Sequence, residues 1–268
     1  MKANRSNLGT RSVMDALKPI SIESVPCKIC GNTSPLYGVV DFNRNCEIAN
    51  GVRLPLCGTA IYYRRCDGCG FLFTDAFDHW NDEQFRSNIY NDSYCIVDPE
   101  YAAQRPNSNA EAVVRLWGNH KADTRVLDYG GGNDVLCEVL RTNGFPVAIT
   151  YDPMVPKFSQ RPKEKFELVT CFETLEHLPD PMLGIAQMIG CVADPGVILF
   201  TTLVQPPDFG TQRLNWWYVG PRNGHISLFS REALVTAWSR HDYRVISFND
   251  NVHLAFRTLP SFLSKLQR

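Results

Sequence analysis

Two pairs of cysteines have the spacing of a metal site. Cys27-Lys-Ile-Cys30 and Cys66-Asp-Gly-Cys69 are each followed by a glycine, and the stretch 31–65 separates the pairs. Each tight turn directs two sulfurs at one point, and four thiolates complete the tetrahedral shell of a structural Zn²⁺, leaving no position for a catalytic water. We therefore predict a structural zinc site, with a redox pair or coincidence as the alternatives. Cys57, or less readily Cys46, could replace one ligand.

A glycine-rich turn comes between a predicted buried strand and a predicted helix. Tyr129-Gly-Gly-Gly-Asn133 follows Asp128, and a second acid, Asp152, stands at the end of the next predicted strand. Glycines allow the backbone to approach a ligand closely. The second acid has about the spacing from the first at which a carboxylate reaches a ribose diol across the edge of a parallel sheet. The pattern indicates a nucleotide-type cofactor; a tight turn without a ligand is the alternative.

Alternating strands and helices from residue 125 onward must position these groups. Strands are predicted over 125–128, 146–151, 166–172 and 197–204, and helices over 135–143, 181–192 and 230–240. Segments 243–248 and 252–258 form a closing hairpin. Short β-type runs at 60–63 and 71–74 flank the second cysteine pair, and a helical pattern covers 109–117. The alternation predicts an α/β, doubly wound, Rossmann-like sheet with a small module in front.

Two long motifs identify a family resemblance. Val126-Leu-Asp-Tyr-Gly-Gly-Gly132 resembles the first motif of class I S-adenosylmethionine (SAM)-dependent methyltransferases, and the segment 166–181 resembles their strand-four motif. The resemblance covers about residues 125–258. It implies that the glycine backbone holds the methionine part of SAM and that Asp152 holds the ribose hydroxyls. The residues assigned to the cofactor in this way are Asp128, Gly130, Gly131, Gly132, Asp152, Pro153, Cys171, Phe172 and Glu173.

The sequence departs from that family pattern at two places. Asp134 stands where the family has a third glycine, which could alter the start of the following helix. Only the stretch 153–165 separates Asp152 from Phe166, which is too short for the usual helix, strand and further helix. We therefore expect one strand of the seven-stranded sheet to be missing or vestigial.

The cysteine pairs resemble the zinc-binding N-terminal domain of some bacterial sugar methyltransferases. These include C-methyltransferases that act on nucleotide-linked deoxysugars. The resemblance implies that the segment 89–101 links this module to the catalytic domain, and that Tyr90, Tyr94 and Tyr101 help to cover the active site. Packing between two domains is the alternative role for these tyrosines.

The segment 216–230 follows the predicted strand 197–204 and is rich in aromatic and hydrogen-bonding residues. Loops beyond the carboxyl ends of strands form the acceptor site in such sheets. Indole and phenol rings could stack on a sugar face, or fill the core instead, and Arg222 and Asn223 could hold hydroxyls or a phosphate. The predicted substrate contacts are Tyr90, Tyr94, Trp216, Trp217, Tyr218, Arg222 and Asn223.

Methyl transfer to a hydroxyl group benefits from a base that takes the proton. Histidine suits this role because its unperturbed pKa lies near 6.5. His225, in the aromatic segment, is the preferred base, although it could merely orient the backbone of a turn. His177 and Glu176, which follow the predicted strand 166–172, are the other catalytic candidates. Alternatively, Glu173, Glu176 and His177 could bind a divalent ion that polarises the acceptor hydroxyl.

Composition narrows the classes of partner. Twenty-seven Lys and Arg residues oppose 28 Asp and Glu residues among 268, so no basic excess points to nucleic acid. The longest near-apolar stretch, 196–204, is about half of a membrane span. The opening stretch 1–20 contains no apolar run typical of a signal peptide. We expect a cytoplasmic protein with a small-molecule or glycan substrate; its oligomeric state does not follow from the sequence.

The predicted organisation is a lead-in at 1–24, a zinc-binding module at 25–75, a linker or lid at 76–120 and a methyltransferase domain at 121–268. The predicted function is SAM-dependent methyl transfer to a sugar, at a hydroxyl, of a nucleotide sugar or a surface glycan. An RNA base methyltransferase with a zinc finger is one alternative. A non-catalytic scaffold that has lost cofactor binding is the other.

Overall fold

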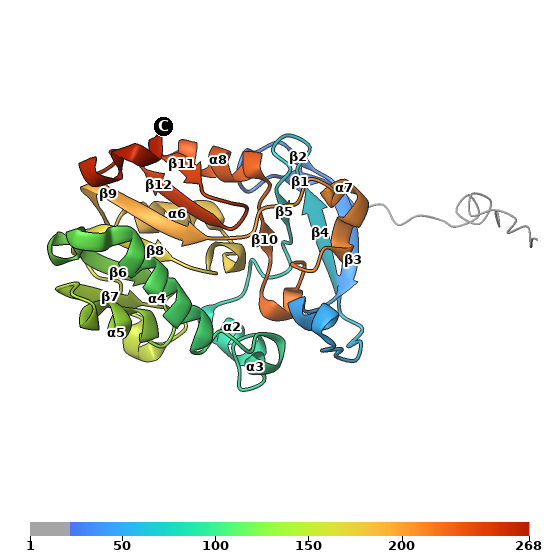
Figure 1. The fold of residues 1–268 in the computed structure, drawn as a ribbon. Coiled ribbons are helices and arrows are strands. Elements are labelled where there is room, and N and C mark those ends of the chain that lie inside the picture. Colours follow the sequence, from blue (N-terminus) through green and yellow to red (C-terminus); the bar gives the residue numbers. More distant parts are fainter. Residues whose placement is uncertain (1–21, 268) are drawn as a thin grey trace, which may run out of the picture.

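The computed structural model describes residues 22–267, so the predicted lead-in lies almost wholly outside the described residues. A six-stranded sheet in the order β11-β12-β9-β8-β6-β7 forms the larger part (Figure 1). Its strands are β6 (Arg125–Tyr129), β7 (Val147–Tyr151), β8 (Phe166–Cys171), β9 (Val192–Thr201), β11 (Arg244–Ser247) and β12 (Val252–Phe256). The first four are parallel, and β11 and β12 form an antiparallel hairpin beside β9. This topology confirms the predicted doubly wound α/β sheet.

Helices cover both faces of this sheet. The helices are α4 (Gln104–Trp117), α5 (Val135–Thr142), α6 (Pro181–Ile189) and α8 (Arg231–Ser239). Successive strand residues point to opposite faces. Val126 accordingly packs in the cluster that contains α4 and α5, and Leu127 packs in the cluster that contains α6 and α8. The sheet is therefore buried on both sides, and its carboxyl edge is left for a site.

The connection between β7 and β8 contains a single 3₁₀ turn, η3 (Pro156–Phe158). As a result β7 is the edge strand, and the sheet in the described residues has six strands instead of the family's seven. The shortened connection predicted from the sequence is confirmed.

Asp134 begins α5 in a left-handed conformation, with a φ of 71°. Most residues avoid this region, but Asp tolerates it when its side chain is held locally. Thr150 Oγ1 donates to Asp134 Oδ1 at 2.5 Å, and Arg141 Nη2 pairs with Asp134 Oδ2 at 2.9 Å. These contacts let an aspartate stand where the family has a glycine.

A smaller antiparallel sheet has the order β10-β5-β4-β3. Its strands are β3 (Leu36–Asp41), β4 (Ala60–Arg65), β5 (Leu72–Phe73) and β10 (Ser227–Leu228). A separate two-stranded ribbon, β1 (Val25–Pro26) with β2 (Thr33–Ser34), flanks the first cysteine pair. In Figure 1 the orange β10 lies beside the cyan β5, so a segment from the C-terminal half completes the N-terminal sheet. Sequence patterns did not indicate this strand, because so short a strand carries no period.

The remaining helices are short. The α-helical pieces are α2 (Asp82–Asn88), α3 (Tyr94–Val97) and α7 (Phe209–Gln212). The 3₁₀ turns are η1 (Cys46–Asn50), η2 (Gly118–Asp123), η4 (Leu175–His177), η5 (Arg213–Asn215), η6 (Pro221–Asn223) and η7 (Ser261–Gln267). None of the helices in the described residues combines the length and apolar character needed to cross a membrane.

Candidate active site

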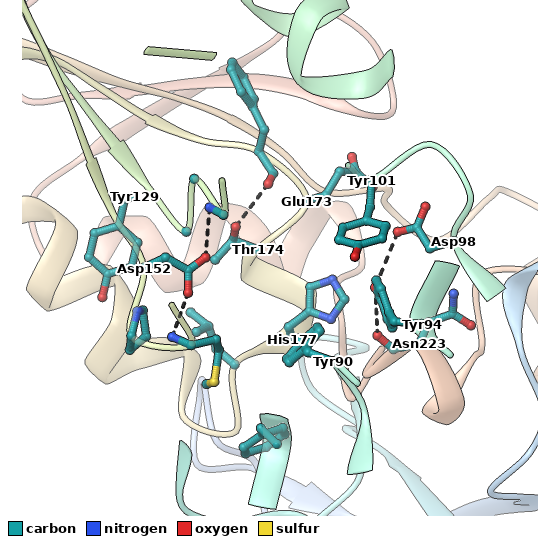
Figure 2. A pocket seen from close by; sticks show the side chains of 18 of the residues that line it. Tyr90, Tyr94, Asp98, Tyr101, Tyr129, Asp152, Glu173, Thr174, His177 and Asn223 are labelled. Atoms are coloured by element: carbon teal, nitrogen blue, oxygen red, sulfur yellow. Dashed lines mark hydrogen bonds between the residues drawn. The ribbon is translucent and has the colours of Figure 1, made fainter. Parts of the chain in front are cut away.

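A cavity of about 870 Å³ lies just beyond the carboxyl ends of β6, β7 and β8. The predicted site residues that line it are Asp128, Gly130, Gly131, Gly132, Asp152, Pro153, Phe172, Glu173, Tyr90, Tyr94, Trp217, Tyr218, Asn223, His177 and His225. In Figure 2, Asp152 lies on one side of the cavity and His177 with Tyr90 on the other. Cys171, Glu176, Trp216 and Arg222 do not line it.

The glycine turn forms a cradle that side chains would fill. A Cβ atom at Gly130, where φ is 78°, would lie 2.3 Å from Thr174 Oγ1, and one at Gly131 would lie 2.3 Å from a carboxylate oxygen of Asp128. The Gly132 amide donates to Asp152 Oδ2 at 3.0 Å, which ties the turn to the neighbouring strand. Because the backbone itself faces the cavity, the turn suits a ligand that approaches the main chain closely.

Of the two acids at this edge, Asp128 is buried and Asp152 is partly buried. Asp128 accepts a hydrogen bond from Thr170 Oγ1 at 2.6 Å, yet burial raises its pKa to about 7. Burial also raises the pKa of Asp152, although the Met154 and Gly132 amides donate to its carboxylate and oppose the shift. Asp152 thus lies between the glycine turn and the cavity, where a carboxylate can reach a diol.

His177 and His225 lie side by side, with ring centroids 4.9 Å apart. His225 Nδ1 is 2.9 Å from the Tyr218 carbonyl oxygen, and His177 Nδ1 is 3.1 Å from that of Gly224. A carbonyl accepts only, so each Nδ1 carries the hydrogen and each Nε2 keeps a lone pair. Burial lowers the pKa of His177 to about 4 and that of His225 to about 3, so both rings are neutral at pH 7.

Glu176 lies behind the cavity wall. Its side chain is fully buried and accepts a hydrogen bond from the Tyr218 hydroxyl, and burial raises its pKa. The Tyr218 ring in turn packs 4.2 Å from the His225 ring. One ligand atom from each of Glu176, His177 and His225 lies within 4.8 Å of the others. Glu173 is not part of this group but lines the cavity, and burial raises its pKa to about 7.

An ion pair in the segment before the methyltransferase sheet also lines the cavity. Arg105 donates to both carboxylate oxygens of Asp98, at 2.7 and 3.1 Å. The Tyr94 hydroxyl lies 3.4 Å from Asp98 Oδ2 and 3.3 Å from the Asn223 carbonyl, as Figure 2 shows. Sequence reasoning missed Arg105, because two charged residues seven apart are not a motif unless a turn and a helix start bring them together.

Some residues of the aromatic segment 216–230 line the cavity, and others are buried in the core. Trp217 lines the cavity and is 50% exposed, whereas Trp216 is buried among core residues. The Arg222 guanidinium donates to the Ile89 carbonyl at 3.1 Å and to Ser93 Oγ at 2.8 Å. A buried guanidinium needs such partners. Arg222 therefore fixes the segment leading to α3 and is not free to hold a substrate.

Asn223 lines the cavity, but its side chain joins two segments. Its amide nitrogen donates to the Val97 carbonyl at 2.7 Å, and its amide oxygen accepts from the Cys46 backbone at 2.9 Å. Cys46 itself was missed as a cavity residue by sequence reasoning. Its Sγ lies 3.4 Å from His225 Nδ1, and burial raises the pKa of the thiol. No local pattern marks it, because its neighbour in space is 179 residues away.

The four paired cysteines converge. The Sγ atoms of Cys27 and Cys69 are 3.7 Å apart, those of Cys30 and Cys66 are 3.3 Å apart, and all four lie within 4.8 Å of one another. Sulfurs around a tetrahedral zinc ion are separated by about 3.8 Å. The cluster has the donor set and the dimensions of a zinc site. Cys57, by contrast, is exposed, and its Sγ lies near the Asp41 carboxylate at 3.4 Å.

Comparison with known proteins places this site in a family. A family model described as a methyltransferase domain matches residues 101–248, more than half of the chain. The chain therefore belongs to this family, and it carries an S-adenosylmethionine-dependent methyltransferase domain with a Rossmann-like fold. The match begins before residue 121, where the sequence analysis placed the start of the domain, and includes α4.

Individual relatives are distant. The ubiquinone biosynthesis O-methyltransferase of Hahella chejuensis is 31% identical over 145 residues, which cover 43% of this chain and 60% of that protein. The protein of the same name from Saccharophagus degradans is 28% identical over 109 residues, which cover 32% and 46%. The chain thus spans about half the length of such relatives. Magnesium protoporphyrin IX methyltransferase from Synechocystis is 15% identical with a TM-score of 0.43, covering 69% of this chain and 97% of that one.

Proposed function

We propose that this chain transfers a methyl group from SAM to a hydroxyl group of a sugar, either in a nucleotide sugar or in a glycan. The observation that carries the proposal is that two neutral histidines and a half-exposed tryptophan face the same cavity as the glycine cradle. The glycines would hold the methionine part of the donor and Asp152 its ribose. SAM supplies an electrophilic methyl group on a positively charged sulfur.

His225 is the proposed base. The Tyr218 carbonyl fixes Nδ1 as the donor, so Nε2 can accept the proton of the acceptor hydroxyl. The low pKa that burial gives His225 makes this imidazole by itself a weak base. During transfer, however, His225 gains a positive charge as the methyl donor loses its own, so the net charge of the cavity stays constant. His177, 4.9 Å away, then orients the acceptor instead of competing for the proton.

Trp217 supports a sugar acceptor. An exposed indole face beside carboxylates offers an apolar surface for C–H groups and acceptors for hydroxyls. The curated relatives are named for ubiquinone biosynthesis, so a ubiquinone intermediate is the competing acceptor. RNA fits less well, because Arg105 is the only Lys or Arg among the described residues that line the cavity.

We also propose that Cys27, Cys30, Cys66 and Cys69 hold a structural zinc ion. The ion would fix both cysteine turns and, with them, the sheet to which β10 is paired. Mass spectrometry of the native protein should find one zinc per chain. A metal-free protein with unchanged thermal unfolding would contradict this role.

The group of Glu176, His177 and His225 supports a second way to activate the acceptor. Two imidazoles and one carboxylate could chelate a divalent ion that polarises the hydroxyl. Exposure to a chelator weak enough to spare the cysteine site, followed by addition of Mg²⁺ or Mn²⁺, distinguishes the two mechanisms. If turnover disappeared with the chelator and returned with the ion, the acceptor would be activated by the metal and not by His225 as a base.

The test of the function is transfer of labelled methyl groups to three pools of acceptor. The pools are sugars and their nucleotide conjugates, hydroquinones related to ubiquinone intermediates, and RNA. We expect label in the sugar pool. Label found only in hydroquinones or RNA would overturn the proposed function, and failure to bind SAM in calorimetry would support a non-catalytic scaffold.

A further inference from the structure

A second cavity of about 420 Å³ adjoins the main one. Five residues line both: Cys46, Glu47, Asp98, Arg105 and Trp217. The two cavities therefore lie side by side at these residues, and the smaller one is called the outer chamber below. Its other walls come from η1 and from the turn that follows α3. A molecule whose reacting hydroxyl lies beside the histidines can extend past Trp217 into this chamber.

The outer chamber has an excess of negative charge. Glu47, Asp98 and Glu100 line it, and Arg105 is its only basic residue within the described part of the chain. Arg105 is paired through two hydrogen bonds with Asp98, so the charges of Glu47 and Glu100 are uncompensated. The Arg44 guanidinium next to Cys46 is directed away, because it donates to the carbonyls of the 216–219 segment. No Lys or Arg other than Arg105 lines either cavity within residues 22–267.

This charge disfavours phosphate. Two like charges about 4 Å apart repel each other in water, and they repel more strongly where solvent is partly excluded. A diphosphate would meet the two uncompensated carboxylates without an arginine or lysine to neutralise it. Sugar hydroxyls, in contrast, donate to carboxylates. The Asn50 amide nitrogen donates to Glu47 Oε2 at 2.7 Å and so holds that carboxylate at the chamber wall, and the half-exposed Trp217 ring adds an apolar platform.

We infer that the outer chamber binds a second sugar unit of the acceptor and that this unit carries no phosphate, being neutral or amino-substituted. The inference rests on the proposed sugar acceptor. It decides between the two acceptors left open above, in favour of a glycan or glycoside over a nucleotide sugar. Trp217 and Glu47 are then specificity-determining residues. Trp217 belongs to the aromatic segment 216–230, and Glu47 belongs to the predicted zinc-binding module at 25–75.

The experiment compares methyl transfer to phosphate-free oligosaccharides with transfer to nucleotide diphosphate sugars. We expect the wild-type protein to favour the phosphate-free pool by at least about tenfold in kcat/KM, which corresponds to about 1.4 kcal/mol of repulsion between a phosphate and the two carboxylates. Glu47→Lys/Glu100→Lys should reduce this ratio at least about tenfold. Glu111→Lys/Glu138→Lys, with the same charge change at exposed sites outside both cavities, should leave the ratio unchanged.

A further variant tests the platform. Trp217→Ala should raise KM for oligosaccharides about tenfold, since a stacked aromatic surface is lost, while the Kd for SAM stays constant. Equal or faster transfer to nucleotide sugars by the wild-type protein would overturn the inference and leave the proposed function intact. Transfer to neither sugar pool would overturn the proposed function itself, and the inference with it.

Discussion

The two sides of the active site are built in different ways. The side proposed to bind the cofactor consists of the ends of β6, β7 and β8, where residues 128–132, 152–154 and 172–174 line the cavity. The acceptor side joins η1, the segment around α3, η4 and the 216–225 segment. Its hydrogen bonds span the chain: Cys46 to Asn223 and Arg44 to Val219 link residues 177 and 175 positions apart.

The two sides of the cavity therefore depend on different features of the fold. The cofactor side follows from the topology of a parallel sheet, in which neighbouring strands end at one edge. The side proposed to bind the acceptor is held by contacts with the predicted zinc-binding module at 25–75, because β10 pairs with β5 and Cys46 lies against His225. We therefore expect damage to the module to abolish acceptor chemistry and to spare SAM binding.

The largest effect should come from breaking the cysteine cluster. Cys66→Ser removes one zinc ligand, and structural zinc sites contribute folding free energy directly, so the loss should amount to several kcal/mol. We expect less zinc per chain, a lower first thermal transition and no turnover, with SAM binding within a few-fold of wild type. Cys57→Ser, at an exposed cysteine outside the cluster, is the control. A zinc-free variant with full turnover would show that the acceptor side does not need the module.

The next effect concerns the base. His225→Gln should lower kcat by about 10²- to 10⁴-fold, the usual contribution of a positioned general base. The Kd for SAM should stay constant, because the cradle is on the other side of the cavity. His79→Gln, at an exposed histidine outside the cavity, should change neither quantity. Steady-state kinetics and calorimetry measure the two quantities separately; retained turnover would remove His225 from the mechanism.

On the cofactor side, Asp152→Asn should weaken SAM binding. A hydrogen bond to a charged group contributes about 1.5–3 kcal/mol, so Kd should rise by about 10- to 100-fold. The value of kcat at saturating SAM should fall far less, which is the converse of the His225 result. Asp123→Asn, at an exposed position, is the matched control. If kcat fell and Kd did not, Asp152 would belong to the acceptor side.

The same division explains what could be predicted from the sequence. The turn at 129–133 and the acid at Asp152 form a local pattern, and the structure brings them together at the cavity as the strand order requires. The missing strand was also predictable, because the stretch 153–165 is too short to hold it. Trp216 and Arg222 were assigned to the substrate by residue type, but the long-range packing that buries one and pairs the other leaves no mark in the local sequence.

Cys46 and Arg105 illustrate the converse. Neither belongs to a motif. Cys46 lies at the cavity against His225, which is 179 residues along the chain, and Arg105 lines the cavity while paired with Asp98. Composition and period report which face of an element is buried, but they do not report which two buried faces meet. Acceptor sites of this kind therefore need the structure, whereas the cofactor cradle does not.

The smallest effect concerns the stability of the cofactor side as pH changes. Burial raises the pKa of Asp128 to about 7, above its value in the unfolded chain, so the folded state holds this proton more tightly. The contribution to stability is present below the unfolded pKa of about 4 and is lost as pH rises through 7. Between pH 6 and 8 the loss for such a group is about 1.4 kcal/mol.

Asp128→Asn, which cannot ionise, should remove this loss. The loss is measured by urea unfolding of the SAM-free wild type and of the variant at pH 6, 7 and 8. The difference between their free energies of unfolding isolates Asp128, because the contributions of the cysteines and histidines are the same in both proteins. We expect the wild type to lose about 1.4 kcal/mol relative to the variant over this range. Parallel curves would mean that Asp128 is ionised throughout and that the acid beneath the glycine turn is stabilised by its neighbours more strongly than burial opposes it.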